Sequence, residues 1–203
     1  NKLVEGIKQL LKGYGVEVVA GEGSLAAPHT VTVKDADGER QIKAEHILLA
    51  TGAVPAIPPI PGADLPGVIT SDDLLEIAEP PAELVIIGGG VIGVEFASIF
   101  RALGSEVTIV ELLPAILPAM DSEVSRMMTL FLKKRGIKVE TGCRVQQITG
   151  GAAGLTVHIE QDSGSRTFTA QKVLLSTGRV FSAGGLNLDN LLVNYDRKGI
   201  KVD

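Results

Sequence analysis

The feature that most constrains the fold is a glycine-rich turn between two apolar runs, in the stretch VIIGGGVIGVEFASIFRALGSEVTIVE at residues 85–111. The run before the turn is short and β-branched, as in a buried strand, and the run after it has helical spacing. In this context Gly88 permits a tight turn, Gly90 lets a pyrophosphate approach the backbone, and Gly93 lets the helix pack closely on the strand. The pattern predicts a strand–turn–helix unit that binds a dinucleotide, although such glycines can also serve a tight turn alone.

Two carboxylates accompany the turn. Glu111 ends the next apolar strand, 23 positions after Gly88, where an acidic side chain accepts hydrogen bonds from an adenosine ribose and repels a 2′-phosphate. The residues that follow it, LLPAIL, include no Arg or Lys to hold such a phosphate, so the sequence favours NAD over NADP. A solvated glutamate after a strand is the alternative. Glu95 lies near the start of the helix, where stabilisation of the helix dipole alone could also account for it.

Around the turn, strands alternate with helices. This alternation predicts an α/β fold with a Rossmann-like parallel sheet and a small antiparallel β-meander. The expected strands are 84–87, 107–110, 137–140 and 173–176, with an antiparallel pair at 156–160 and 167–170; the expected helices are 72–78, capped by Ser71-Asp72-Asp73, then 91–103 and 123–135, the last capped by Asp121 or Ser122.

The first third of the chain has a different pattern. It predicts a helix at 2–13, strands at 17–20 and 47–50, and a hairpin of 30–34 with 39–43 about Asp37-Gly38. The stretch AVPAIPPIPGADLPG at 53–67 carries five prolines and is expected to be a linker or domain boundary.

Composition excludes several function classes. A net charge of −5 and a pI near 5.3 argue against nucleic acid as a partner. The sequence has no apolar run of the roughly 18 residues that a membrane span needs, so we expect no membrane association. The single cysteine, Cys143, cannot form an internal disulfide; it fits a reducing cytoplasm and is expected to be a buried filler. The three histidines have no metal-ligand spacing, and neither a catalytic triad nor a carboxylate pair can be assembled, so no catalytic and no metal-binding residue is predicted.

Four segments together resemble one family. They are GEG at 21–23, PHTVTV at 28–33, HILLATGAVPAIPPIPG at 46–62 and the glycine-turn stretch. The chain resembles, over essentially its whole length, the flavin-dependent pyridine nucleotide-disulfide oxidoreductases, and most of all their members that oxidise dihydrolipoamide. The similar pentapeptides LLATG (48–52) and LLSTG (174–178) match the paired motifs at which this family's chain passes between its flavin and nicotinamide domains.

The resemblance implies a domain plan and a set of cofactor contacts. Residues 1–65 would be part of an FAD-binding domain without its glycine-rich turn, residues 66–180 the NAD-binding domain, and residues 181–203 the start of the return into the FAD domain of this two-dinucleotide-binding-domain flavoprotein fold. It implies NAD contacts at Gly88, Gly89, Gly90, Val91, Ile92, Gly93, Val94, Glu95, Glu111, Val145 and Gly178, with Glu95 near the nicotinamide amide. It implies FAD contacts at Gly23, Thr51, Gly52 and Ala53.

The chain also departs from the family. The glycine fingerprint for FAD and the CxxxxC redox disulfide are absent from these 203 residues. We therefore expect a piece of a longer, homodimeric enzyme that oxidises dihydrolipoamide on the lipoyl domain of a 2-oxo acid dehydrogenase complex and reduces NAD+ through FAD. The piece alone should be inactive and lack flavin, and its strands 16–20 and 47–50, without neighbours, should make it associate through its N-terminal third. Mercuric reductase, glutathione reductase, a soluble transhydrogenase, or a non-catalytic NAD-binding module remain alternatives.

Overall fold

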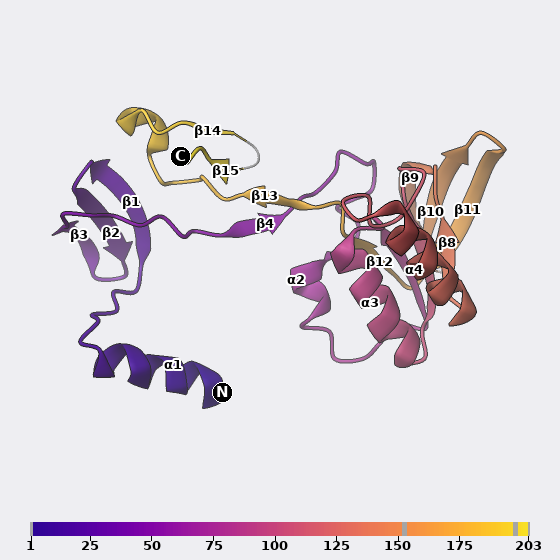
Figure 1. The fold of residues 1–203 in the computed structure, drawn as a ribbon, viewed down its shortest axis with the longest axis horizontal. Coiled ribbons are helices and arrows are strands. Elements are labelled where there is room, and N and C mark those ends of the chain that lie inside the picture. The colour runs from indigo at the N-terminus through magenta and orange to yellow at the C-terminus, as the bar shows by residue number, and fades with distance from the viewer. Residues whose placement is uncertain (1, 152–153, 197–198, 203) are drawn as a thin grey trace. The chain divides into compact units, whose positions relative to one another are not determined.

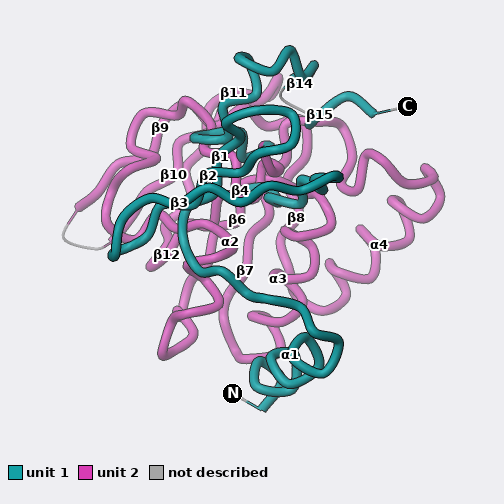
Figure 2. Tube along the Cα trace, turned by 90° about the vertical axis from the view of Figure 1, so that its left-hand side faces the viewer, with its two compact units in different colours: residues 1–53, 181–203 teal, residues 54–180 magenta. Residues whose placement is uncertain are grey.

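The computed structural model describes residues 2–151, 154–196 and 199–202 (Figure 1). The chain divides into two compact units, one made of residues 1–53 and 181–203 and the other of residues 54–180 (Figure 2). The larger unit contains the glycine turn.

The larger unit is organised by a five-stranded sheet in which every neighbouring pair is parallel, as the sequence predicts. Its strand order is β5-β12-β6-β7-β8. The strands are β5 (Val68–Thr70), β6 (Glu83–Ile87), β7 (Glu106–Val110), β8 (Lys138–Glu140) and β12 (Lys172–Leu175), and the helices of this unit are α2 (Ser71–Leu74), α3 (Val91–Ala102) and α4 (Ser122–Lys134).

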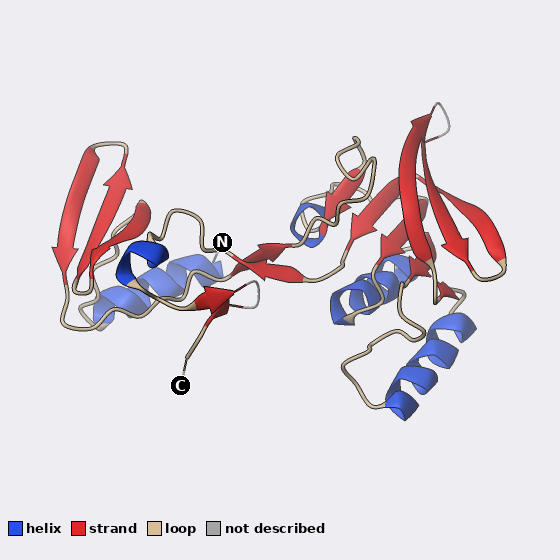
Figure 3. Cartoon of the chain, turned by 90° about the horizontal axis from the view of Figure 1, so that it is seen from above, coloured by secondary structure: helices blue, strands red, loops and turns tan. Residues whose placement is uncertain are grey.

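Both faces of this sheet are covered, and alternate residues of each strand pack into different cores. Leu84 and Ile86 of β6 join the core formed with α3 and α4. Val85 and Ile87 join the opposite core, formed with the antiparallel sheet of β9 (Arg144–Gly151), β10 (Gly154–Gln161) and β11 (Gly164–Ala170) (Figure 3). The β10–β11 pair agrees with the expected hairpin, whereas β9 was not predicted, because polar residues interrupt its alternation.

The two helix starts differ in how well the sequence predicts them. Asp121 caps α4 as expected, its Oδ1 accepting the Glu123 N–H at 2.8 Å. Helix α2 is shorter than predicted and begins one residue earlier, because Thr70 is the N-cap and forms a capping box with Asp73. The helix ends at Leu74, and the next side chain, Leu75, is exposed.

The proline-rich stretch begins at the boundary between the units and then joins the larger one. Strand β4 (Ala53–Pro55) pairs with β13 (Arg179–Phe181) at the two points where the chain passes between units. Farther along, the Ile148 N–H donates to Pro61 O at 2.8 Å, and Ile60, Ala63 and Leu65 pack on the core beneath β9. Most of the expected linker is therefore packed structure.

The smaller unit contains helix α1, the predicted hairpin and short segments from the end of the chain. Asp35 stabilises the hairpin turn, since its Oδ1 accepts the N–H groups of Asp37 and Gly38. The elements are α1 (Lys2–Gly13), β1 (Glu22–Ala27), β2 (Thr30–Asp35), β3 (Gly38–Lys43), η1 (Leu188–Leu191), β14 (Tyr195–Asp196) and β15 (Gly199–Ile200).

Two strands expected in this unit do not form. Residues 17–20 and 47–50 pair with no strand in the described part of the chain, and Val18 and Leu48 are 67% and 91% exposed. Alternating apolar residues favour a strand, but a strand also needs a neighbour to take its backbone hydrogen bonds. Association through the N-terminal third stays a prediction, and the exposed apolar side chains of these segments, rather than strand edges, now support it.

Candidate functional site

A cavity of about 800 Å³ lies in the larger unit at the carboxyl ends of β6, β7 and β12. The chain leaves β6 toward β7 and β8 and later returns to β12 on the other side of β6. The sheet order thus changes direction between β6 and β12, and ligands of open α/β sheets bind outside such a switch point. Gly88 follows β6 and Ser176 follows β12, and both line the cavity.

The three glycines of the turn meet different surroundings. Gly88 has a φ of +114°, and a Cβ on it would lie 2.4 Å from Ser176 O. A Cβ on Gly93 would lie 2.1 Å from Gly88 O, so both positions exclude a side chain through contact with the protein itself. A Cβ on Gly90 would meet no protein atom within 4 Å. Close packing thus requires glycine at 88 and 93, and Gly90 leaves room on the open side of the turn.

The start of α3 is suited to an anion. Gly90 is its N-cap, has extended backbone (φ −73°) and provides no side-chain cap for the first N–H groups. The first turn contains no acidic residue. Unsatisfied N–H groups and the positive end of the helix dipole make such a terminus a phosphate site. Gly90, Val91 and Ile92 all line the cavity, so they fit a pyrophosphate.

Glu111 is buried at the wall of this cavity, with 8% of its surface exposed. Its Oε2 accepts the Gly89 N–H at 2.6 Å and its Oε1 accepts the Leu113 N–H at 2.7 Å. The alternative of a solvated glutamate does not hold. Each carboxylate oxygen has two acceptor sites, so each keeps one for a ribose hydroxyl.

The remaining residues of the predicted NAD set fall into two groups. Val145 and Gly178 line the cavity. Gly89, Gly93 and Val94 are buried and do not line it, and Glu95 is exposed, lies beyond the first turn of α3 and does not line it either. The predicted FAD residues Gly23, Thr51, Gly52 and Ala53 belong to the smaller unit and are not part of this cavity.

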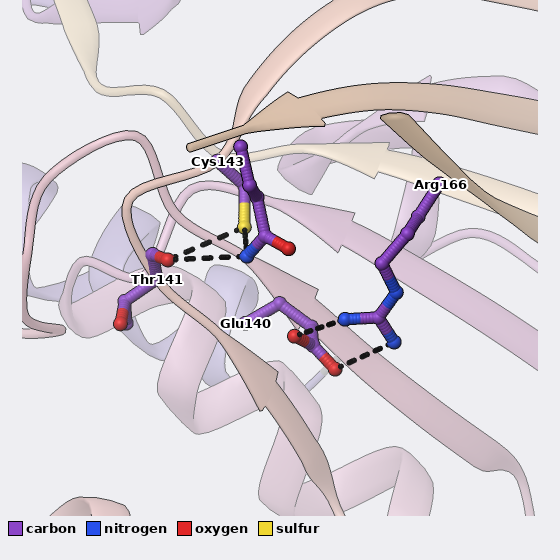
Figure 4. A network of polar contacts seen from close by, with 5 residues as sticks. Glu140, Thr141, Cys143 and Arg166 are labelled. Atoms are coloured by element: carbon purple, nitrogen blue, oxygen red, sulfur yellow. Dashed lines mark hydrogen bonds and ion pairs between the residues drawn. The ribbon is translucent and has the colours of Figure 1, made fainter. Parts of the chain in front are cut away.

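Cys143 is a buried thiol on the cavity wall, 1% exposed (Figure 4). Its Sγ donates to Thr141 O at 3.3 Å and accepts a hydrogen bond from the Gln161 amide at 2.6 Å. Burial raises the pKa of this thiol. Beside it, the Arg166 guanidinium binds both oxygens of Glu140, at 3.0 and 3.4 Å. The protonated thiol acts as the apolar filler that the sequence indicates.

Sequence reasoning did not identify several wall residues. The most informative is Ser176, which follows the LLSTG strand at the switch point; the wall also includes Pro58, Pro59, Arg144 and Arg179. The strand order, in which β12 lies beside β6, would have identified Ser176 as a residue of the cavity wall. Among the described residues no three His, Cys, Asp or Glu side chains group as metal ligands, and no helix there is long and apolar enough to cross a membrane.

The parallel sheet, the glycine turn and the buried acid together define an α/β domain of the Rossmann type, whose cavity has the features that a dinucleotide requires. The family profile of the pyridine nucleotide-disulphide oxidoreductases matches residues 1–203, and the chain belongs to this family.

Known relatives extend this similarity. The chain is 38% identical to dihydrolipoamide dehydrogenase of Chaetomium thermophilum, over 97% of this chain and 40% of that protein. It is 34% identical to a dihydrolipoyl dehydrogenase of Bacillus subtilis, over 94% and 42%. A copper(II) complex of a Cys-to-Ser variant of the HOCl-induced flavoprotein disulfide reductase RclA from Escherichia coli matches with a TM-score of 0.87 and 30% identity, over 98% of this chain and 45% of that one. The chain therefore spans less than half the length of these relatives.

Proposed function

We propose that these 203 residues are the NAD-binding portion, with flanking FAD-domain segments, of a dihydrolipoamide dehydrogenase. The whole enzyme would oxidise dihydrolipoamide, pass the electrons through a redox disulfide and FAD, and reduce NAD+. The proposal rests on one observation. The start of α3, which is suited to an anion, and the buried Glu111 lie at the same cavity. Identities of 34% and 38% to dihydrolipoamide-oxidising relatives support the choice within the family.

The cavity supports NAD rather than NADP. Glu111 carries its negative charge where a 2′-phosphate would lie, and burial prevents the side chain from turning away. Leu112 and Leu113, the next residues on the wall, bring no positive charge. The wall also includes a cationic residue, Arg144. It directly precedes Val145, which the family resemblance places at the adenine end.

The flavin and the partners belong to the whole enzyme in this proposal. Gly23, Thr51, Gly52 and Ala53 would contact FAD; Gly52 has a φ of +71°, so a side chain there would be strained. The lipoyl domain of a 2-oxo acid dehydrogenase complex would be the substrate carrier, and the enzyme would be a homodimer. A single buried cysteine supports a reducing, cytoplasmic compartment. Because the chain contains no cysteine pair, we expect no disulfide-reductase activity from it alone.

Titration of the purified chain with NADH and NADPH tests the proposal. The absence of tryptophan leaves the nicotinamide fluorescence free of energy transfer from that residue. We expect NADH to bind with a Kd between about 10 μM and 1 mM and clearly more tightly than NADPH. Equal binding would favour an NADPH-tolerant relative such as glutathione reductase. Absence of binding at millimolar NADH would contradict the proposal for this chain.

A non-catalytic NAD-binding module is the second candidate, since the described cavity needs no catalytic group to hold a dinucleotide. The sequence of the gene around this segment separates the two. A CxxxxC pair upstream of residue 1 would support the dehydrogenase, and its absence would favour the module.

A further inference from the structure

Ser176 occupies a buried position between the glycine turn and the end of β12. It is 9% exposed. Its Oγ lies 2.9 Å from Gly88 O and 3.1 Å from Ile87 O, and its single hydroxyl proton serves these two carbonyls. Its backbone N–H also donates to Ile87 O, at 2.8 Å. Ser176 therefore contacts the chain at the point where β6 ends and the turn begins.

The surrounding glycines hold this hydroxyl in place. A Cβ on Gly93 would lie 2.8 Å from Ser176 Oγ, and one on Gly88 would lie 3.1 Å from it. The hydroxyl fills the space that those two glycines leave. Its hydrogen bond to Gly88 O is thus part of the packing between β6, β12 and α3.

One peptide unit is held at both ends by side chains that directly follow two different strands, β12 and β7. The carbonyl of the Gly88–Gly89 peptide accepts from Ser176, and the N–H of the same peptide donates to Glu111 Oε2 at 2.6 Å. These two contacts oppose rotation of the peptide plane, which glycines would otherwise permit. The orientation of this plane determines where the next N–H groups, those of Gly90 and Val91 at the cavity, point.

We propose that Ser176 is a positioning residue for the dinucleotide: with Glu111 it fixes the Gly88–Gly89 peptide and so holds the glycine turn ready for a pyrophosphate. The inference rests on the proposed function, because it concerns how the same cavity binds NAD. It assigns Glu111 two tasks, contact with the ribose and support of the turn, and it assigns Ser176 the second task only.

The test compares ligands with and without a pyrophosphate on the 203-residue chain. Ser176→Ala should weaken NADH and ADP-ribose by roughly 3- to 10-fold, the worth of one neutral hydrogen bond, and change adenosine by less than about 2-fold. Ser105→Ala is the matched control: Ser105 is buried, its Oγ donates to Pro81 O at 2.6 Å, and it is not part of the cavity wall. That control should bind all three ligands within about 2-fold of wild type.

Two further variants make the outcome decisive. Ser176→Thr keeps the hydroxyl and should recover NADH affinity, and Ser176→Cys replaces Ser176→Ala if the alanine variant does not fold. Wild-type affinity for NADH in Ser176→Ala would overturn the inference. So would an equal loss for adenosine, an equal loss in Ser105→Ala, or no recovery in a folded Ser176→Thr. Failure of the proposed function is a separate result, since the wild type itself would then not bind NADH.

Discussion

Alanine at two glycines of the turn should separate binding from stability. Gly90 and Gly93 lie three residues apart on one helix start, but a Cβ at 90 meets no protein atom within 4 Å, whereas a Cβ at 93 lies 2.1 Å from Gly88 O. We expect Gly90→Ala to weaken NADH binding strongly and leave the fold intact. We expect Gly93→Ala to destabilise the larger unit.

The magnitudes follow from these contacts. A Cβ is in ordinary contact with a carbonyl oxygen at about 3.4 Å, so α3 and the turn must separate by more than about 1 Å to admit a methyl group at 93. Overpacking of this kind costs about 1–3 kcal/mol, against which the helix propensity of alanine returns up to about 1 kcal/mol. Gly90 is an N-cap with extended backbone, so alanine there costs less than about 1 kcal/mol. Its methyl group instead displaces the phosphate from N–H groups, and the loss of charge-assisted hydrogen bonds weakens NADH more than about 10-fold.

Urea unfolding, followed through the amide signals of β6, and titration with NADH measure the two effects. Gly151→Ala is a control, because Gly151 lies in β9 with open space around it and is not part of the cavity wall. Unchanged stability of Gly93→Ala would refute the close approach of helix and turn. Wild-type NADH affinity in Gly90→Ala would refute the path of the pyrophosphate over that residue.

Four other perturbations have defined outcomes. Glu111→Gln loses one acceptor and the charge that repels a 2′-phosphate, so fluorescence titration should show weaker NADH binding and a smaller preference over NADPH; an unchanged preference would contradict the role of Glu111. Burial raises the pKa of Cys143, so iodoacetamide at pH 8 should alkylate the folded chain at least about 10-fold more slowly than the urea-unfolded chain, and NADH should slow it further. The raised pKa in the folded chain means that the protonated thiol stabilises the fold. This stabilisation is complete below the pKa of the thiol in the unfolded chain and is lost as the pH rises through its pKa in the folded chain. If the wild-type chain loses no more stability at alkaline pH than Cys143→Ala, this linkage is contradicted. Asp121→Ala removes the N-cap of α4 and should lower the free energy of unfolding by about 1 kcal/mol in urea, whereas no loss would contradict its capping role.

The sequence predicts the larger unit well because local signals agree there with the fold. The glycine spacing, the β-branched runs and Asp121 each act within a few residues, and the parallel sheet follows from their alternation. Strand β9 has no such signal, since it forms by pairing with β10 and by the bond from Ile148 to Pro61. The expected strands at 17–20 and 47–50 show the converse, an apolar pattern without a pairing strand in the described chain.

The residues by themselves predict only those parts of the candidate site that have a fixed spacing in sequence, whereas Val145 and Gly178, which also line the cavity, are predicted only by the family resemblance. Gly88, Gly90 and Glu111 have fixed spacings that the chemistry requires. The contact of Ser176 with Gly88 joins residues 88 positions apart, and no spacing rule reports it. Glu95, which the resemblance places near the nicotinamide amide, is exposed beyond the first turn of α3 and outside the cavity wall, so its contact with a nicotinamide stays a prediction.

The two apolar faces of β6 affect how its alignment in the sheet is specified. A shift of this strand by one residue would exchange Leu84 and Ile86 with Val85 and Ile87 between two apolar cores. Because both cores accept apolar side chains, the hydrophobic pattern of the strand opposes such a shift only weakly. The turn that follows opposes a shift in either direction. One direction brings Ile87 to position 88, where a Cβ lies 2.4 Å from Ser176 O, and the other brings Val94 to position 93, where a Cβ lies 2.1 Å from the carbonyl oxygen of position 88. The glycine turn at the cavity thus also aligns the central strand, and chains altered at Gly88 or Gly93 are expected to misfold, unlike chains altered at Gly90.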